Sequence, residues 1–268
     1  MSVIRSRDNV RVRRWRKLAA SRRARRSEGR ALIEGVHLVG TLLASRGRLD
    51  ALIVSESGLA QPEIASLMER SPVRPVVLSD SLFSSIADAE SPAGIAAEIV
   101  LPKVEPNLAT CGSCVFLEGV QDAGNVGALL RSAAAFGLGD AVLGPGCADA
   151  WSPKALRAGM GAHFALRIGS RIDLAAAFER FAGTIVCTVA RGGAPIAQAD
   201  LRGRIGWLFG GEGQGVSEAL AARSDLRVTI PMPGAAESLN VAAAAAICFY
   251  ERSRQLDTHA TRSGTCAG

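Results

Sequence analysis

The chain has 268 residues, of which 48% are hydrophobic, and a formal net charge of +6. This length can bury a sizeable core and lies between one large domain and two ordinary ones, so we expect two domains. The composition argues against a membrane-spanning protein, because the apolar run at 241–250 ends at Glu251 and a helix needs about 20 apolar residues to cross a bilayer.

The first 30 residues are the most basic part of the sequence. Twelve basic and two acidic residues give this segment +10, which leaves −4 for the rest of the chain. A basic element attached to a mildly acidic body predicts a polyanionic partner such as RNA or DNA, because each Lys or Arg placed at a phosphate releases counterions. The basic residues are Arg5, Arg7, Arg11, Arg13, Arg14, Arg16, Lys17, Arg22, Arg23, Arg25, Arg26 and Arg30.

Two other interpretations of this segment stay open. An Arg-rich, acid-poor start is also typical of a transit peptide, and a basic helix face can simply be solvated. Against the transit peptide, Asp8-Asn9 is a plausible helix start, and Val12, Trp15 and Leu18 form the apolar stripe of a folded helix.

The first half of the sequence alternates between strand and helix patterns. We expect strands at 31–33, 52–54, 76–78 and 95–100, and helices at 36–44 and 63–69. The stretch 101–108 contains two prolines and has no periodicity, which is typical of a linker. We therefore predict an N-terminal α/β domain over residues 1–104.

A second α/β series fills residues 105–258. The expected strands are 115–117, 141–143, 184–189, 205–209 and 227–230, and the expected helices are 126–136, 153–160, 174–181, 217–223 and 239–254. The end of the chain lacks any such pattern, and we predict a disordered tail over 259–268.

The six cysteines are scattered, which favours a reducing compartment and hence the cytoplasm. Cys111 and Cys114 have the C-x-x-C spacing of half a zinc site. No second pair accompanies them, and the three histidines stand far apart in sequence, so we interpret them as linker and buried-strand residues and predict no metal site.

Three loops that follow expected strands have unusual compositions. They cover 118–127, 210–215 and 231–240, and ligands of parallel sheets bind at the carboxyl ends of the strands. The sequence has no G-x-G-x-x-G in the first turn of a strand–helix unit and no G-x-x-x-x-G-K-[ST], so the familiar phosphate cradles are absent. The loop at 210–215 offers instead a backbone with few Cβ atoms and one carboxylate, Glu212.

Read together, these loops resemble the three motifs of the SpoU/TrmH branch of the SPOUT methyltransferases. The first is Asn125-x-Gly127-x-x-x-Arg131, the second runs over 208–215, and the third joins 230–232 to Ser238-Leu239-Asn240-Val241. The segment 152–162 is also similar to that branch. Glu34-Gly35 and 91–95 are similar to its substrate-binding domain, which implies that residues 1–104 form an RNA substrate-binding domain. The sequence departs from the family at Ala123, where proline is usual, and at Gly211, where asparagine is frequent.

The resemblance implies an RNA ribose 2′-O-methyltransferase that uses S-adenosyl-L-methionine. It implies a homodimer and a C-terminal domain with a parallel sheet and a deep trefoil knot, which periodicity alone would never predict. Carried over residue by residue, it assigns catalysis to Asn125, Arg131, Glu212, Ser238 and Asn240, and cofactor contacts to Gly210, Ile230 and Leu239.

Chemical reasoning refines one of these roles and leaves another open. A free guanidinium keeps its proton above pH 12, so we expect Arg131 to bind the phosphate beside the target ribose and to stabilise the developing alkoxide. Glu212 either positions Arg131 or Asn125, or accepts a proton.

By analogy with family members that have a separate N-terminal domain, large-subunit rRNA is favoured over tRNA as the substrate. The alternatives are a tRNA methyltransferase and an inactive RNA-binding or ribosome-assembly protein of the same fold. A nucleotide-dependent oxidoreductase lacks its fingerprint here.

Overall fold

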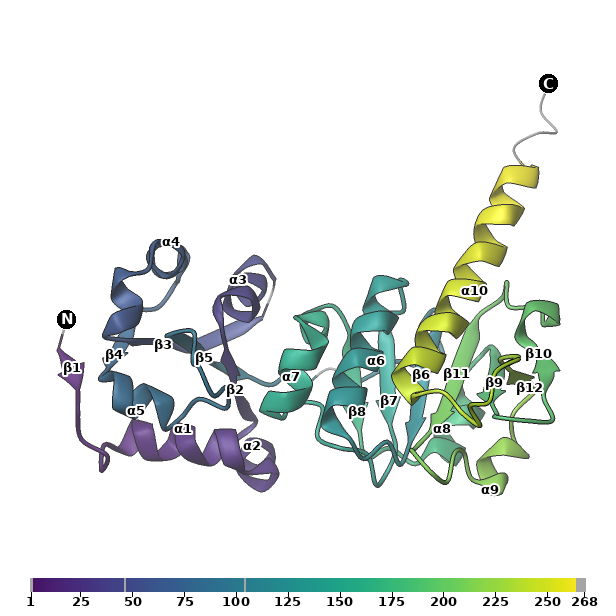
Figure 1. The fold of residues 1–268 in the computed structure, drawn as a ribbon, viewed down its shortest axis with the longest axis horizontal. Coiled ribbons are helices and arrows are strands. Elements are labelled where there is room, and N and C mark those ends of the chain that lie inside the picture. The colour runs from purple at the N-terminus through teal and green to yellow at the C-terminus, as the bar shows by residue number, and fades with distance from the viewer. Residues whose placement is uncertain (1, 46, 104, 264–268) are drawn as a thin grey trace. The chain divides into compact units, whose positions relative to one another are not determined.

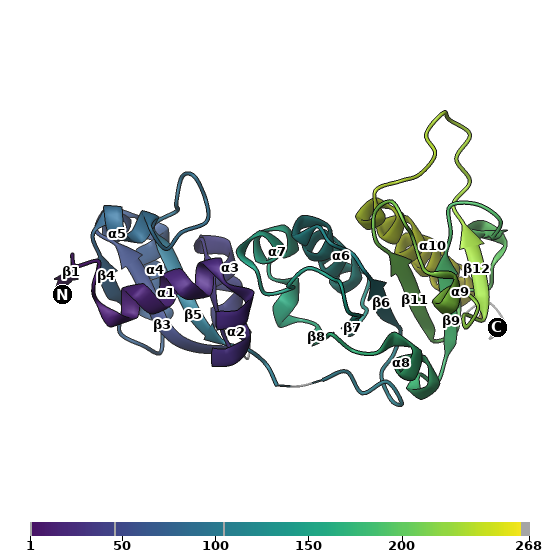
Figure 2. The same ribbon diagram turned by 90° about the horizontal axis from the view of Figure 1, so that it is seen from below.

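The computed structural model describes residues 2–45, 47–103 and 105–263. The chain divides into two compact units, shown in Figures 1 and 2. Unit 1 comprises residues 1–103 together with 149–165, and unit 2 comprises 104–148 together with 166–268. The chain therefore passes between the units three times, whereas the sequence suggested two consecutive domains.

Unit 1 is built on a five-stranded mixed sheet with the order β1-β4-β3-β5-β2. Strand β5 is antiparallel to β2 and β3, and the other pairs are parallel. The strands are β1 (Val3–Ile4), β2 (Arg30–Glu34), β3 (Arg48–Ser55), β4 (Val76–Leu78) and β5 (Ile95–Val100). The helices before residue 100 are α1 (Val10–Ala20), α2 (Arg22–Glu28), α3 (Val36–Ala44), α4 (Pro62–Arg70) and α5 (Asp80–Ser84), with the 3-10 turn η1 (Ser57–Ala60).

Alternation along the strands gives this sheet two apolar faces. Ala31 and Ile33 belong to the cluster that packs on α3 and α4, whereas Leu32 belongs to the cluster that packs on α1 and α5. Successive side chains of a strand point to opposite faces, so a sheet covered on both sides needs nearly continuous apolar strands. Figure 1 shows the result, with α3 and α4 on one side of the sheet and α1, α2 and α5 on the other.

The predicted start and apolar stripe of the first helix are confirmed. Asn9 caps α1 by accepting a hydrogen bond from the backbone N–H of Arg11 at 2.9 Å, and Val12, Trp15 and Leu18 are buried. Ser21 ends this helix and caps α2. The basic segment is therefore two helices packed on a sheet.

The segment 149–165 belongs to unit 1 through specific contacts. It contains α7 (Pro153–Gly159) and the 3-10 turn η2 (Ala162–Phe164). Leu156 joins the core cluster with Ala31 and Ile33, and Asp149 accepts a hydrogen bond from Arg25 Nε at 2.7 Å. Buried apolar surface and a half-buried ion pair hold this segment against the first unit.

Unit 2 contains a seven-stranded parallel sheet with the order β10-β12-β9-β11-β6-β7-β8. The predicted α/β class, with a C-terminal parallel sheet, is confirmed. Its strands are β6 (Cys114–Glu118), β7 (Asp140–Leu143), β8 (Arg167–Ser170), β9 (Thr184–Thr188), β10 (Ala194–Pro195), β11 (Ile205–Gly210) and β12 (Leu226–Thr229). The helices are α6 (Ala123–Ala135), α8 (Leu174–Arg180), α9 (Glu218–Ala221) and α10 (Val241–Ser263), with the 3-10 turn η3 (Ile196–Gln198).

Helices cover both faces of this second sheet. Helices α6 and α10 lie side by side on one face (Figure 1), where Phe249 of α10 packs edge-on against Trp207 and Phe209. On the other face, Phe116 contacts Phe178 and Phe181 around α8. This packing fixes the starts of α6 and α10 at the carboxyl edge of the sheet.

The last helix differs from its prediction. Helix α10 continues to Ser263, so residues 259–263 of the expected disordered tail are helical, and 264–268 lie outside the described residues. The short strands β1, β8 and β10 were missed in the sequence. Among the helices that the structure describes, none is both long and apolar enough to cross a membrane. The trefoil knot stays a prediction.

Candidate active site

The unusual loops of the sequence meet at the carboxyl ends of four neighbouring strands. These strands, β12, β9, β11 and β6, are adjacent in the sheet, although long stretches of sequence separate them. The loop between β12 and α10 extends from that edge (Figure 2). A cavity of about 530 Å³ lies at the loops after β9, β11 and β12, lined by Thr188, Val189, Ala190, Phe209, Gly210, Gly211, Glu212, Gly213, Gln214, Gly215, Val216, Val228, Ile230, Met232, Ser238, Leu239, Asn240, Val241 and Ala244.

Two glycines let the backbones at this site approach closely. A Cβ atom on Gly210 would lie 2.0 Å from the carbonyl carbon of Gly215, and one on Gly211 would lie 2.1 Å from the carbonyl oxygen of Gly119. Gly211 is the position where the family often has asparagine, and in this chain the loop after β6 occupies the space that a side chain would need. Both positions therefore require glycine.

A hydrogen-bonded chain of three polar side chains crosses the site. Asn125 donates through Nδ2 to Glu212 Oε1, and its Oδ1 accepts from Asn240 Nδ2 at 2.9 Å. The three residues come from the start of α6, the loop after β11 and the residue before α10. The network therefore links all three sequence motifs.

Helix caps hold two members of this network in place. Asp122 Oδ1 accepts from the backbone N–H of Asn125 at 2.9 Å, which fixes the first turn of α6. Asn240 Oδ1 accepts from the N–H of Ala242 at 2.9 Å and so caps α10. Since the Asn240 oxygen is used by its own helix, the amide nitrogen is left to bind Asn125.

The structure separates the predicted site residues into three groups. Asn125 does not line the cavity, but it is hydrogen-bonded to two residues that do. Arg131 is exposed, and its side chain makes no hydrogen bond or ion pair within the described residues. It is six residues beyond Asn125 on α6, about 240° around the helix, so it points away from the network. Six of the predicted site residues line the cavity: Gly210, Glu212, Ile230, Ser238, Leu239 and Asn240.

The loop after β9 also lines the cavity and was missed in the sequence. Thr188, Val189 and Ala190 contribute to the wall. Thr188 Oγ1 donates to the carbonyl of Leu208 at 3.0 Å, and the N–H of Val189 donates to the carbonyl of Val228 at 2.9 Å. The sequence here has no distinctive motif, and only the position of β9 between β11 and β12 reveals its role.

The cysteines near the sheet do not form a metal cluster. No group of three or more His, Cys, Asp or Glu side chains suited to a metal occurs among residues 2–45, 47–103 and 105–263. Burial raises the pKa of Cys187, the neighbour of Thr188, to about 11, so this thiol stays protonated at neutral pH. A hydrogen bond with Cys114 lowers the pKa of Cys111 below its ordinary value, and Cys114 begins β6 with its side chain buried.

Comparison with known proteins decides the family. The model of the SpoU rRNA methylase family matches residues 112–250, just over half of the chain and nearly all of unit 2 outside its ends. The chain belongs to the SpoU rRNA methylase family. A second model, the MRM3-like substrate binding domain, matches residues 9–97 of this SpoU family member.

Relatives of this SpoU family member cover almost its whole length. The 23S rRNA guanosine 2′-O-methyltransferase RlmP of Bacillus subtilis is 36% identical over 93% of this chain and 98% of that protein. The crystal structure of the SpoU methyltransferase AviRb from Streptomyces viridochromogenes with the cofactor AdoMet aligns with a TM-score of 0.85 at 25% identity, covering 92% of this chain and 98% of that one. A crystal structure of an RNA 2′-O ribose methyltransferase aligns with a TM-score of 0.81 at 28% identity, over 95% and 99% of the two chains.

Proposed function

We propose that this SpoU family member is an RNA ribose 2′-O-methyltransferase that uses S-adenosyl-L-methionine and acts on large-subunit rRNA. The observation that carries the proposal is a hydrogen-bonded network in which Asn125 of the first motif bridges Glu212 and Asn240, which belong to the other two motifs and line one cavity. The similarity to RlmP over nearly the whole chain supports both the reaction and the class of RNA.

The cavity fits a nucleoside-type cofactor. Its volume of about 530 Å³ lies within the range of small-molecule sites, and its wall combines apolar side chains with backbone amides and carbonyls. Phe209, Ile230 and Leu239 offer apolar surface to a flat base, and the glycines from 210 to 215 expose backbone polar groups to its edges. These residue types suit S-adenosyl-L-methionine, which supplies an electrophilic methyl group when bound.

The protein's own residues would then orient a ribose hydroxyl and receive its proton. Asn125 has both a donor and an acceptor on its amide, and the bonds to Glu212 and Asn240 fix which atom faces which neighbour. Glu212 thus positions Asn125 through one oxygen. Its second oxygen has no donor among the described residues, so this carboxylate is the proton acceptor we propose.

Ser238 and Arg131 would act on the RNA. Ser238 lines the cavity two residues before the cap of α10, where its hydroxyl can bind a ribose oxygen. Arg131 is exposed on α6 and carries a permanent charge, which suits a phosphate beside the target ribose. Separating these tasks explains why Arg131 need not enter the cavity.

We further propose that the enzyme is a cytoplasmic homodimer, in which unit 2 has the trefoil knot of its family. On α10, Ala243, Ile247 and Tyr250 form an exposed stripe, and Ile247 and Tyr250 are 39% and 60% exposed. An apolar stripe at helical spacing favours a second helix as its cover. The five described cysteines are free and buried, which is compatible with a reducing compartment.

The test is to map 2′-O-methylated nucleotides in total RNA from cells with and without the gene, and to repeat the reaction with purified protein, labelled cofactor and rRNA transcripts. Loss of one large-subunit site that the purified enzyme restores would support the proposal. Loss of a tRNA site would replace rRNA by tRNA as the substrate. A protein that binds RNA without binding labelled cofactor would be an inactive RNA-binding member of the family.

A further inference from the structure

We propose that the outward faces of α1 and α2 form a binding surface for the phosphate backbone of the RNA substrate. This inference rests on the proposed function and names where unit 1 grips the RNA. The basic residues among the first 30 divide into two groups. One group pairs with other residues of unit 1, and the other faces outward.

The inward group of arginines is held by acidic or carbonyl partners. Arg14 donates to Glu98, which is fully buried in β5 and also bound by Trp15 Nε1 at 2.7 Å. Arg25 is buried and donates to Asp149 at 2.7 Å and to the carbonyl of Leu18 at 2.6 Å. These cations hold the helices to unit 1 and have little left to offer a ligand.

The outward group has no such partners. Arg13, Lys17, Arg23 and Arg26 are exposed, and none of their side chains makes a hydrogen bond or ion pair within the described residues. On α1, Arg13 and Lys17 lie four residues apart, about 180° around the helix from the stripe that Val12, Trp15 and Leu18 bury. On α2, Arg23 and Arg26 are one turn apart.

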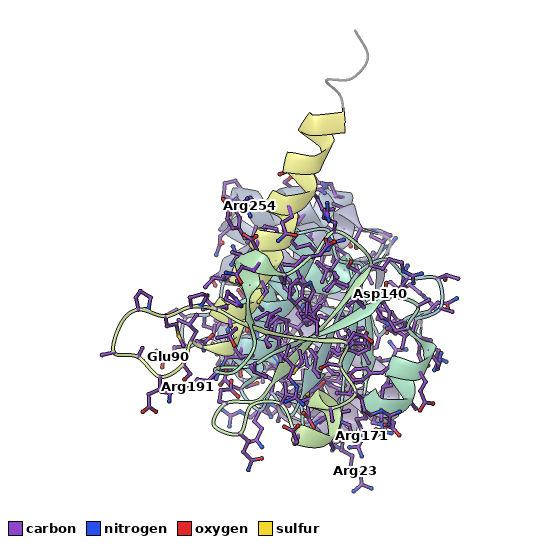
Figure 3. The ribbon with its side chains drawn as sticks, turned by 90° about the vertical axis from the view of Figure 1, so that its right-hand side faces the viewer. Arg23, Glu90, Asp140, Arg171, Arg191 and Arg254 are labelled. Carbon is purple, nitrogen blue, oxygen red and sulfur yellow. The ribbon has the colours of Figure 1, made fainter. Side chains whose placement is uncertain are left out.

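The surface is open and free of competing acid. Figure 2 shows α1 and α2 in front of the sheet with no element covering them, and Figure 3 shows Arg23 pointing away from the ribbon. The two acidic residues of the segment do not cover it, since Asp8 precedes α1 and Glu28 pairs with Arg14. Gathering uncompensated cations on one face costs electrostatic repulsion, which an anionic partner relieves.

The chemistry of the face points to phosphates and away from bases. Within α1 and α2, both of which the structure describes in full, no aromatic side chain is exposed for base stacking, because Trp15 is buried. Arginine and lysine contacts to phosphate position a nucleic acid without reading its sequence. The surface therefore supplies affinity, and the choice of nucleotide is made elsewhere.

The test compares three double variants that each remove two charges. Arg13→Gln with Lys17→Gln, and Arg23→Gln with Arg26→Gln, alter the proposed surface. The matched control is Arg70→Gln with Arg74→Gln. Both residues are exposed: Arg70 ends α4, a helix on the opposite side of the sheet in unit 1, and Arg74 lies between α4 and β4. The probe is a 23S rRNA domain transcript, titrated at several salt concentrations.

We expect each surface variant to reduce the slope of log Kd against log salt by about 2, because each lost phosphate contact removes about one counterion from the equilibrium. The control should keep the wild-type slope. Binding of labelled cofactor should be the same in all variants, and methylation at saturating RNA should recover while KM for RNA rises about tenfold.

Wild-type slopes in both surface variants would overturn the inference, and so would equal losses in the control. Neither result would contradict the proposed function as long as the wild-type protein methylates RNA. Conversely, a wild-type protein without methyl transfer would defeat the proposed function, whatever the slopes show.

Discussion

The proposed RNA surface of unit 1 and the cavity of unit 2 are built from different parts of the polypeptide. The surface of unit 1 consists of long charged side chains on helices. The buried ones stabilise the fold through ion pairs, and the exposed ones face solvent. The cavity in unit 2 works with backbone, glycine and neutral amides, and its only carboxylate is Glu212. Charge attracts a polymer at long range, whereas fixed amides and close backbones hold small groups in one geometry.

Basic residues that look alike in a sequence can have different roles in the folded protein. The twelve cations of the first 30 residues look alike in composition, but Arg14 and Arg25 belong to the structure of unit 1 and Arg13 and Lys17 face solvent. In unit 2 the same question does not arise, because Glu212 is the one charged side chain among the residues that line the cavity. The following predictions separate the two modes.

The largest effect should come from Asn125→Ala. This change removes both hydrogen bonds that join the three motifs, so we expect kcat to fall roughly 100- to 1000-fold, the range for losing a preorganised polar group at an active site. Single-turnover methylation measures it. The control is Asn107→Ala, an exposed asparagine of unit 2 that does not line the cavity. A tenfold or smaller loss would mean that the network does not organise the reaction.

Glu98→Gln should destabilise unit 1 by about 3 kcal/mol, because it leaves Arg14 and Arg30 without the buried carboxylate that binds both. Urea unfolding measures the change. Glu179→Gln, which breaks an exposed pair with Arg223, should cost less than about 1 kcal/mol. Equal costs would show that the inward arginines do not stabilise the fold.

Acid should destabilise the protein through His163. Burial lowers the pKa of this side chain from its ordinary 6.5 to about 4, so the folded state favours the neutral ring. Its contribution is complete above pH 6.5 and is lost as the pH falls toward 4, where the unfolded chain binds the proton first. Between pH 7 and 4.5 we expect the wild type to lose about 2 to 3 kcal/mol more than His163→Gln. Parallel pH profiles in urea unfolding would contradict this assignment.

A smaller effect is expected from Gly210→Ala. The new Cβ would overlap the backbone of Gly215, and relief of that overlap should cost about 2 kcal/mol, equivalent to roughly 30-fold weaker cofactor binding. Calorimetric titration with S-adenosyl-L-methionine measures it. Gly234→Ala, whose Cβ would meet nothing within 4 Å, should bind like the wild type. Unchanged binding in Gly210→Ala would show that the cavity does not hold the cofactor.

Hydrophobic periodicity, together with turn and capping residues, predicted most helices and strands correctly. Helix α3 has the predicted bounds, and so do strands β4 and β5. The predicted end of α10 came more than two turns too early, because the residues beyond Arg254 are mostly polar or charged and show no apolar helical pattern. The short strands were missed because pairing with a neighbour, and not local preference, makes them strands.

By itself the sequence determined the two apolar patterns, the α/β class and the three motifs, since each depends on residues close together along the chain. Only the tertiary structure decided that residues 149–165 pack in unit 1 and that Thr188 to Ala190 complete the cavity wall. Strand order and long-range packing place these residues, and no local pattern encodes either.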